Sequence, residues 1–192
     1  MGHRKGKGRV QGVAPASFVR RAIAFLIDWY VGALATALPV AYIAMQLGKD
    51  MADQDILSFP EPSGLTAGAL GILFGIAYYA LVPALQNGQT LGKRVMGVRV
   101  AALDGAPASP LRLLGRQVIG LMVVEGAAVG TSTVIWQVVS LLTGGDIVMP
   151  AMAVGTVLTL ASLVVCALNP RHRAIHDLLF GTVVVPAKGA DA

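Results

Sequence analysis

The chain has 192 residues, of which 55% are hydrophobic and only 13% are charged, and its mean hydropathy is +0.70. An average soluble domain carries about 25% charged residues, and a chain of this length cannot hide so much apolar surface in a soluble core. The same figures exclude intrinsic disorder, and the single cysteine, Cys166, excludes an intrachain disulfide scaffold. The composition therefore predicts a membrane protein.

Four apolar segments are long enough, or nearly so, to cross the roughly 30 Å of bilayer hydrocarbon, which takes about 20 helical residues. They cover residues 22–47, 65–85, 117–142 and 151–168. Asp28 is the one charged residue inside the first segment, and Glu125 interrupts the third. We therefore expect an all-α membrane protein with four transmembrane helices, in which residues 17–186 form the membrane domain and residues 1–16 and 187–192 form tails.

Basic residues flank these segments on one side. Of the fifteen lysines and arginines, six precede the first segment, five lie between the second and third, and three follow the fourth, which leaves Lys49 alone on the other side. Positively charged loops stay in the cytoplasm, so we expect both termini there. We also expect this cationic surface to attract anionic lipid headgroups. No aromatic stacking platform accompanies it, so it does not indicate nucleic-acid binding.

The connection between the second and third segments is rich in glycine and basic residues. Its motif consists of Gly88, Gly92, Lys93, Arg94, Gly97 and Arg99. The phosphate-binding loop of nucleotide hydrolases needs four residues between its glycines, and a serine or threonine after its lysine. Here three residues separate Gly88 from Gly92, and Arg94 follows Lys93. We therefore expect a cationic turn at the membrane interface that contacts lipid phosphates.

Short regular elements are expected in this connection and in the C-terminal tail. Residues 98–100 alternate apolar and polar side chains, and residues 182–185 are rich in β-branched side chains, so we expect two short β-strands that pair. Residues 171–180 predict a short interfacial helix. Within it, His172 and His176 would share a face, but a metal site needs further ligands, so we expect no metal site.

Three blocks of polar and glycine-rich sequence are spread over residues 17–186. They are Arg20-Arg21 with Ala24 and Ile27-Asp28, then Gly88 to Arg94 with Gly97 to Val100 and Asp104-Gly105, and lastly Arg173 to Asp177 with Gly181 to Val185. Together they resemble the RDD family of bacterial membrane proteins, although Arg173 stands where a glutamine is common. The family is named for one arginine and two aspartates, which the resemblance assigns to Arg21 (or Arg20), Asp28 and Asp177. It implies a multi-pass protein of the bacterial inner membrane, in a family for which transport has been suggested.

The two carboxylates inside the predicted spans are the candidates for function. A carboxylate within a span costs about 2.5–3.5 kcal/mol on insertion scales, so it usually faces a partner or water. At about 1.5 Å per residue, Asp28 and Glu125 lie roughly 10–12 Å from the same membrane face. They would bind a cation or relay protons in a polar cavity that faces the cytoplasm. The alternative for Asp28 is a structural contact with Arg21, seven residues earlier on the same side of the helix.

Two functions from different classes fit these features. The first is a small-cation or proton transporter, and because four helices offer little wall for a pore, it implies an oligomer. The second is a non-transporting scaffold or accessory subunit that binds a partner membrane protein through the cytoplasmic loop and tail. Glycines spaced four apart, such as Gly64 and Gly68, allow close helix packing within one chain or between copies. All three histidines lie in the tails, away from any serine of the spans, so we expect neither an enzyme nor a bound cofactor.

Overall fold

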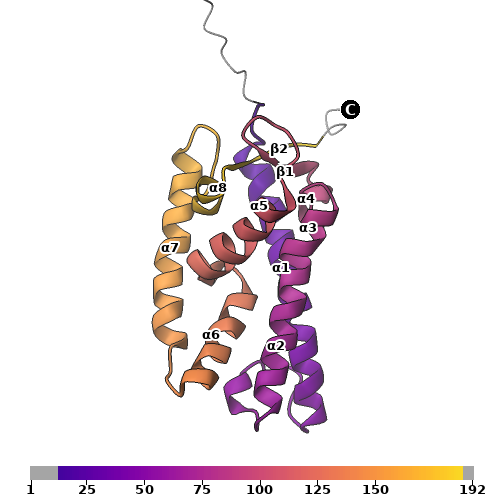
Figure 1. Cartoon of the computed structure of the whole chain (residues 1–192), viewed down its shortest axis with the longest axis vertical. Helices are drawn as coiled ribbons and strands as arrows, with labels where there is room; N and C mark the ends of the chain where they lie inside the picture. Colours follow the sequence, from indigo (N-terminus) through magenta and orange to yellow (C-terminus); the bar gives the residue numbers. More distant parts are fainter. Residues whose placement is uncertain (1–12, 188–192) are drawn as a thin grey trace, which may run out of the picture.

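Three helices in residues 13–187, the part of the chain that the computed structural model describes, are long and apolar enough to cross a membrane. They are α1 (Phe18–Gln46), the continuous run of α2 (Ser63–Ile76), η2 (Ala77–Leu81) and α3 (Val82–Leu85), and α7 (Val148–Leu168). They overlap the first, second and fourth predicted spans, and each begins a few residues earlier than predicted. In Figure 1 they run along the long axis of the molecule.

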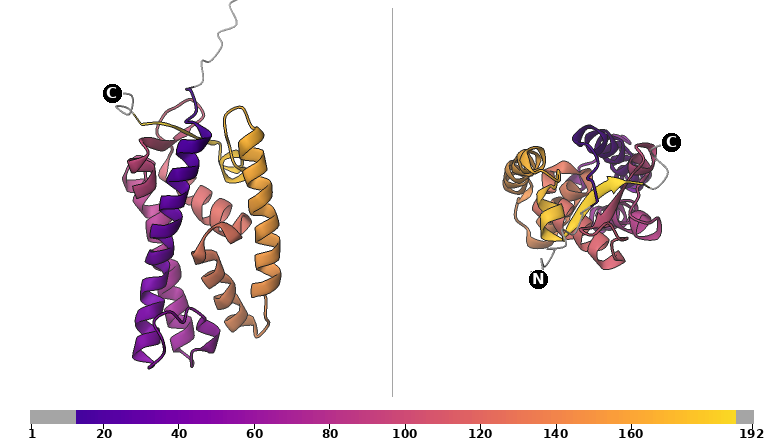
Figure 2. Two further views of the ribbon diagram at one scale, coloured as in Figure 1. Left: turned by 180° about the vertical axis from the view of Figure 1, so that it is seen from behind. Right: turned by 90° about the horizontal axis from the view of Figure 1, so that it is seen from above.

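The remaining elements are short. They are η1 (Ile56–Ser58), α4 (Leu91–Val95), β1 (Val98–Ala102), α5 (Pro110–Gly115), η3 (Arg116–Val124), η4 (Gly126–Ala128), α6 (Gly130–Thr143), α8 (Ile175–Leu179) and β2 (Thr182–Pro186). Five of them, α4, β1, α5, α8 and β2, form what we call the cap, at one end of the helices (Figure 1). Both ends of the described chain lie at the cap, and β2 crosses over the bundle there when it is seen from above (Figure 2).

The two predicted strands pair, as the alternation and β-branching of their residues indicated. β1 and β2 are antiparallel, with Val100 opposite Val184 and Ala101 opposite Val183. The N–H of Ala16 donates to the carbonyl oxygen of Val184 (2.9 Å), so the start of the described chain joins the same sheet. Val100 and Val184 are buried against Leu113 of α5. The sheet therefore ties the C-terminal tail to the central connection and to the N-terminal end.

The third predicted span, residues 117–142, is not one continuous helix. η3 is a π-helix that ends at Val124, a short 3-10 turn follows, and Val129 is fully extended (φ −142°, ψ 140°) before α6 begins. Gly126 sits in the turn with φ 30°, a backbone conformation that favours glycine. The prediction of one transmembrane helix over residues 117–142 was therefore wrong, because the helix breaks at Glu125, the charged residue that interrupts the apolar run.

Side chains satisfy the backbone groups that this break releases. The Thr159 hydroxyl donates to the carbonyl oxygen of Glu125, and the Ser132 hydroxyl donates to that of Met122 (2.8 Å). Unpaired backbone groups are very costly in hydrocarbon, so irregular backbone persists at such depth only where protein buries it or where it lines a cavity. The break is consequently a built feature of the fold, held by α6 and α7.

The buried face of α1 is a stripe of mostly small residues, and its other face carries exposed apolar side chains. The stripe consists of Ala24, Asp28, Gly32, Thr36, Val40 and Ala44. It packs on α2, whose glycines at 64, 68, 71 and 75 are buried in the same bundle, so these glycines serve packing within one chain. α1 also packs on η2, the continuation of α2, where a Cβ atom at Gly32 would overlap the ring of Tyr79.

Gly32→Ala is expected to lower the free energy of unfolding by about 1–3 kcal/mol, because the fully buried Tyr79 ring has no room to move aside. Gly130→Ala is the matched control, since nothing lies within 4 Å of a Cβ at that position. Thermal unfolding of both variants in detergent measures the difference. Equal melting temperatures for the two variants would contradict this account of the α1–α2 packing.

Candidate functional site

A cavity of about 360 Å³ lies next to the cap, between α1 and α7. These two helices stand apart from each other when the molecule is viewed from behind (Figure 2). Apolar side chains of α1 and α7 form part of its lining, among them Phe18, Phe25, Leu26 and Leu163. The charged and titratable part of the lining includes Arg21, Asp28, Lys93, Arg116, Glu125 and His176. Charged residues from distant parts of the sequence therefore meet at one cavity.

Asp28 is buried, and its carboxylate accepts four hydrogen bonds. Oδ2 accepts from Lys93 Nζ (2.8 Å) and from the hydroxyl of Thr90, and Oδ1 accepts from the Tyr78 hydroxyl (2.8 Å) and from the backbone N–H of Gly92 (2.8 Å). Three of these donors belong to the segment that contains α4. Asp28 thus docks α4 onto α1, and Lys93 supplies the countercharge.

Two residues of the loop motif, Gly92 and Lys93, take part in this docking. A Cβ atom at Gly92 would overlap the backbone carbonyl oxygen of Ala24, so only glycine lets α4 lie this close to α1. Burial lowers the pKa of Lys93, although the neighbouring Asp28 carboxylate acts in the opposite direction. Arg99 donates to the carbonyl oxygen of Gly105 (2.8 Å), inside the cap.

The other members of the loop motif lie away from the cavity lining. Gly97 has φ 62°, and a Cβ atom at Gly88 would overlap the carbonyl oxygen of Val100, so both shape the turn before and beside β1. Arg94 is exposed, and its guanidinium donates to the side chain of Gln86 (2.7 Å). Among the cationic residues of the motif, Arg94 is therefore the exposed one.

Asp177 is completely buried between two arginines. It accepts from Arg21 Nη2 (2.6 Å), Arg116 Nε (2.9 Å) and the Thr182 hydroxyl (3.0 Å). Burial alone would raise the pKa of Asp177, but Arg116 and Arg21 hold it well below its ordinary value. Arg21 thus pairs with Asp177, and Asp28 pairs with Lys93 instead of with Arg21. The three residues assigned to the family motif belong to two separate ion pairs.

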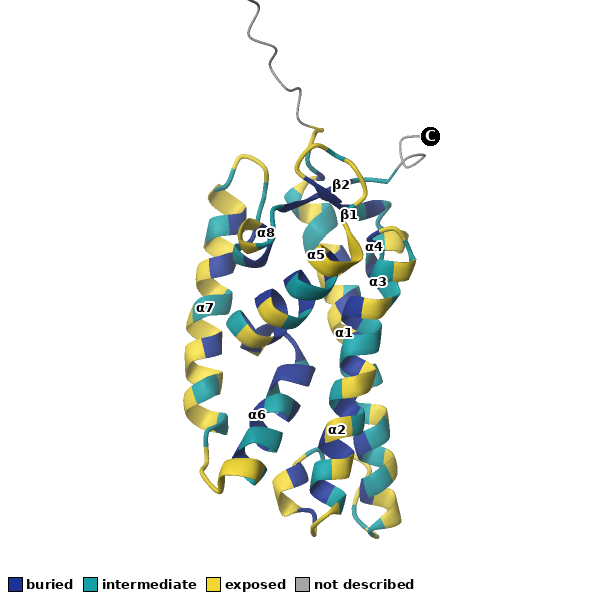
Figure 3. Ribbon diagram, viewed as in Figure 1, coloured by how far each residue is buried: buried dark blue, intermediate teal, exposed yellow. Residues whose placement is uncertain are grey.

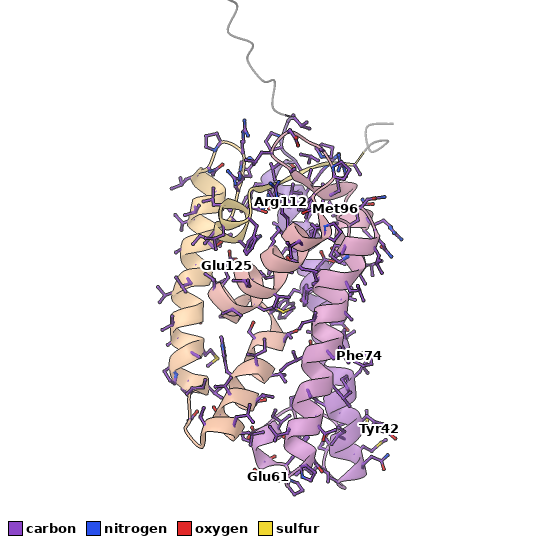
Figure 4. All side chains as sticks on the ribbon, in the orientation of Figure 1. Tyr42, Glu61, Phe74, Met96, Arg112 and Glu125 are labelled. Carbon is purple, nitrogen blue, oxygen red and sulfur yellow. The ribbon has the colours of Figure 1, made fainter. Side chains whose placement is uncertain are left out.

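Glu125 lies at the break between η3 and α6, beside α7 and α8 (Figure 4). Its Oε1 accepts three hydrogen bonds, from the Ser162 hydroxyl (2.8 Å), from His176 N–H (2.9 Å) and from His176 Nδ1 (2.7 Å). Its Oε2 accepts none from residues 13–187, and Glu125 lines the cavity. One carboxylate oxygen of Glu125 is thus held by protein, and the other is left for a proton or a ligand.

The neighbours of His176 indicate which of its ring nitrogens carries the proton. Its Nε2 lies 2.8 Å from Arg116 Nη2, and a guanidinium can only donate, so Nε2 accepts. Nδ1 therefore carries the proton and donates to Glu125. His176 therefore bridges the Arg116 guanidinium and the Glu125 carboxylate through its two ring nitrogens.

Hydrogen bonds lead from Arg116, which contacts His176, to the backbone of Asp28. Arg116 donates to Gln117 Oε1 (2.6 Å), and Gln117 donates in turn to the carbonyl oxygen of Tyr79 (2.7 Å). The Tyr79 hydroxyl donates to the carbonyl oxygen of Asp28 (3.1 Å). Arg116 therefore lies between the surroundings of Glu125 and the part of α1 that contains Asp28.

Several members of this network were missed from the sequence. Arg116, Tyr78, Thr90 and Ser162 carried no assigned role, although Arg116 is the last basic residue before an apolar run and Ser162 is a polar residue within one. The place of Arg116 before an apolar run, and of Ser162 inside one, could have indicated these two residues from the sequence.

The predicted helix over residues 171–180 is shorter in the structure, where α8 is Ile175–Leu179. The prediction that His172 and His176 share a helical face was wrong. His172 lies outside α8 with φ 48°, and its ring faces the end of α7 at the Cys166 carbonyl (3.4 Å). Within residues 13–187, no three histidine, cysteine or acidic side chains are grouped so that they could hold a metal ion.

Asp177→Asn is expected to destabilise the protein by about 3–5 kcal/mol, because it leaves two buried guanidinium groups without a countercharge. Asp104→Asn, in the exposed turn after β1, is the matched control and should change the stability by less than about 0.5 kcal/mol. Thermal unfolding in detergent compares the two. If Asp177→Asn does not accumulate, Arg21→Gln removes one ion pair and should give a smaller loss in the same direction.

The ion pairs of Asp177 also predict how the stability changes with pH. Because the pKa of Asp177 is lower in the folded state, its contribution is complete above its unfolded value of about 3.9 and is lost as the pH falls below it. The melting temperature of the wild type should therefore fall as the pH is lowered below about 4. The corresponding curve of Asp177→Asn should be flatter over that window, and parallel curves would refute the assignment.

One comparison with known proteins identifies a family for this chain. Searches of the curated proteins and of the solved structures find no match to the chain. A profile of the RDD family matches residues 15–181, which include both ion-paired aspartates, the loop motif and the break at Glu125. The chain belongs to the RDD family.

Proposed function

We propose that the chain crosses the bacterial inner membrane four times, with both termini in the cytoplasm. The third crossing is the interrupted pass from η3 to α6, which together lead from the cap to the opposite end of the bundle (Figure 1). Apolar side chains are exposed along α1 and α7, as a lipid environment requires (Figure 3). The basic residues of the central connection gather at the cap, whereas Lys49 lies at the other end, and this asymmetry supports a cytoplasmic cap.

Within that topology, we infer that the protein transports protons through the cavity, with Glu125 as the site where a proton is bound and released. The observation that carries this proposal is the free Oε2 of Glu125, on a residue that lines the cavity at a helix break. Intramembrane ionisable residues at interrupted helices are where membrane transporters place their sites. His176 next to Glu125 holds the carboxylate in place through Nδ1.

A proton suits this site better than a metal cation does. A cation needs several free oxygen ligands, but both oxygens of Asp28 and Oε1 of Glu125 are already occupied by donors. A proton needs one oxygen, and the free Oε2 supplies it.

The proposal includes an oligomer and a contact with anionic lipids. A single chain of four helical passes offers little wall for a continuous path, and the opposite half of the bundle is closed by packing such as the Thr36–Thr131 hydrogen bond (2.7 Å). The exposed Arg94 supplies positive charge at the proposed cytoplasmic interface, where each basic residue contributes about 1 kcal/mol of attraction to anionic headgroups.

Proton flux into liposomes that contain the purified protein tests the transport function. Wild type should acidify the lumen down an imposed gradient, and Glu125→Gln should abolish the flux, because glutamine keeps an Oε1 acceptor for Ser162 and His176 but cannot carry the proton. Glu61→Gln makes the same chemical change at an exposed position and should leave the flux intact.

Asp28→Asn gives the companion measurement. Because Asp28 holds α4 in place, this variant should lower the melting temperature as well as the flux, whereas Glu125→Gln should lower the flux with little loss of stability. Folded wild type without flux under proton, sodium and potassium gradients would refute transport. It would favour the other class, a scaffold or accessory subunit that binds a partner through the cap.

A further inference from the structure

We propose that the cavity between α1 and α7 binds an anionic amphiphile, a molecule with an apolar chain and a phosphate or carboxylate group, and that it takes up a proton together with this ligand. The ligand enters sideways from the bilayer. The binding site stands on the geometry of the cavity alone, and only the proton uptake rests on the proton site proposed at Glu125.

The cavity offers an apolar entrance from the bilayer side. Phe25 and Leu26 of α1 and Leu163 of α7 line the cavity, and all three are also exposed on the outer surface of the bundle. A residue that is exposed outside and lines the cavity inside marks the mouth of that cavity. In a membrane this mouth faces acyl chains, so an apolar chain can occupy it without crossing water.

The charged part of the lining is suited to an anion. Arg21, Lys93 and Arg116 bring three positive groups to one cavity. Arg21 is nine-tenths buried, and its Nη1 has no hydrogen-bond partner among the described residues, although Nη2 is held by Asp177. A buried guanidinium nitrogen without an acceptor is unfavourable, and Nη1 lies below the cavity surface, so a shift of the Arg21 side chain toward the cavity would let an anionic oxygen supply the missing acceptor.

The charges of the whole cluster explain why a proton accompanies the ligand. Apart from His176, three positive groups balance three carboxylates, and these residues are Arg21, Lys93, Arg116, Asp28, Glu125 and Asp177. An incoming monoanion leaves one uncompensated negative charge in a water-poor site. Protonation of the free Oε2 of Glu125 removes it, so anion binding and proton binding strengthen each other.

The single cysteine provides a direct probe. Cys166 lines the cavity, its thiol donates to the carbonyl oxygen of His172 (3.2 Å), and no other cysteine competes for a reagent. Protein in phosphatidylcholine nanodiscs is treated with methyl methanethiosulfonate, with and without dodecyl phosphate, dodecyltrimethylammonium or inorganic phosphate. We expect dodecyl phosphate to slow the labelling of Cys166, and the other two additions to leave the rate unchanged.

Two variants of α7 locate the site without touching any ion pair. Leu163→Trp fills the mouth and should raise the half-protecting concentration of dodecyl phosphate at least about fivefold, which corresponds to roughly 1 kcal/mol. Leu160→Trp makes the same change one turn away on an equally exposed residue outside the lining, and it should bind as the wild type does.

Proton uptake is read from the pH dependence of the same protection. With the labelling rate at each pH divided by the rate without ligand, the half-protecting concentration should fall by up to about tenfold for each unit of decrease in pH, the limit for one linked proton. Dodecyl phosphate itself has a second pKa of about 6, so Glu125→Gln should lose the part of this dependence that exceeds the titration of the ligand, while protection by dodecyl phosphate persists.

Native mass spectrometry of the same samples counts bound dodecyl phosphate. Binding is therefore measured even if the buried Cys166 thiol reacts slowly. Equal protection by dodecyltrimethylammonium, protection by inorganic phosphate alone, or equal effects of Leu163→Trp and Leu160→Trp would overturn the amphiphile site. Protection by dodecyl phosphate in a protein that shows no proton flux would support the site and at the same time reject the proposed transport function.

Discussion

The buried carboxylate of Asp177 connects three distant parts of the chain: Arg21 at the start of α1, Arg116 at the start of η3 and Thr182 in β2. Removing such a charge from water is costly, and the cost is recovered only when the geometry is good and the remaining polar groups are bonded. Asp177 meets this condition, and Arg116 extends the arrangement to His176 and so to Glu125. The position of the proposed proton site is therefore fixed by an ion pair in which Glu125 takes no part.

Patterns that depend on local chemistry could be read from the sequence. Apolar runs of sufficient length identified α1, α2 with its continuation, and α7, because hydrophobicity over about twenty residues is a strong signal. The alternation in residues 98–100 and the β-branched residues 182–185 identified both strands, and their pairing followed because they occupy the same end of the bundle. The order of the motif blocks indicated the RDD family before any contact was known.

Partners across long sequence separations could not be read in the same way. Arg21 is close to Asp28 in sequence and was the obvious partner, yet Lys93, sixty-five residues away, holds Asp28. The choice depends on α4 lying on α1, which in turn requires the small Gly92 opposite Ala24. The break at Glu125 was hidden for a related reason. Its apolar flanks read as one helix, and the groups that stabilise the break, Thr159 and Ser162, lie on another helix.

The order in which the chain is synthesised gives the ion pair at Asp177 a consequence for assembly in the membrane. Arg21 and Arg116 leave the ribosome well before Asp177, which lies close to the C-terminal end. Until then the two guanidinium groups have no buried countercharge, and an unpaired charge strongly resists transfer out of water. In the topology proposed above, the ends of α1 and η3 that carry these arginines therefore stay near the membrane interface until α8 and β2 have been synthesised. The cap is completed by α8 and β2 only after the apolar helices α1, α2 and α7, which precede them in the chain.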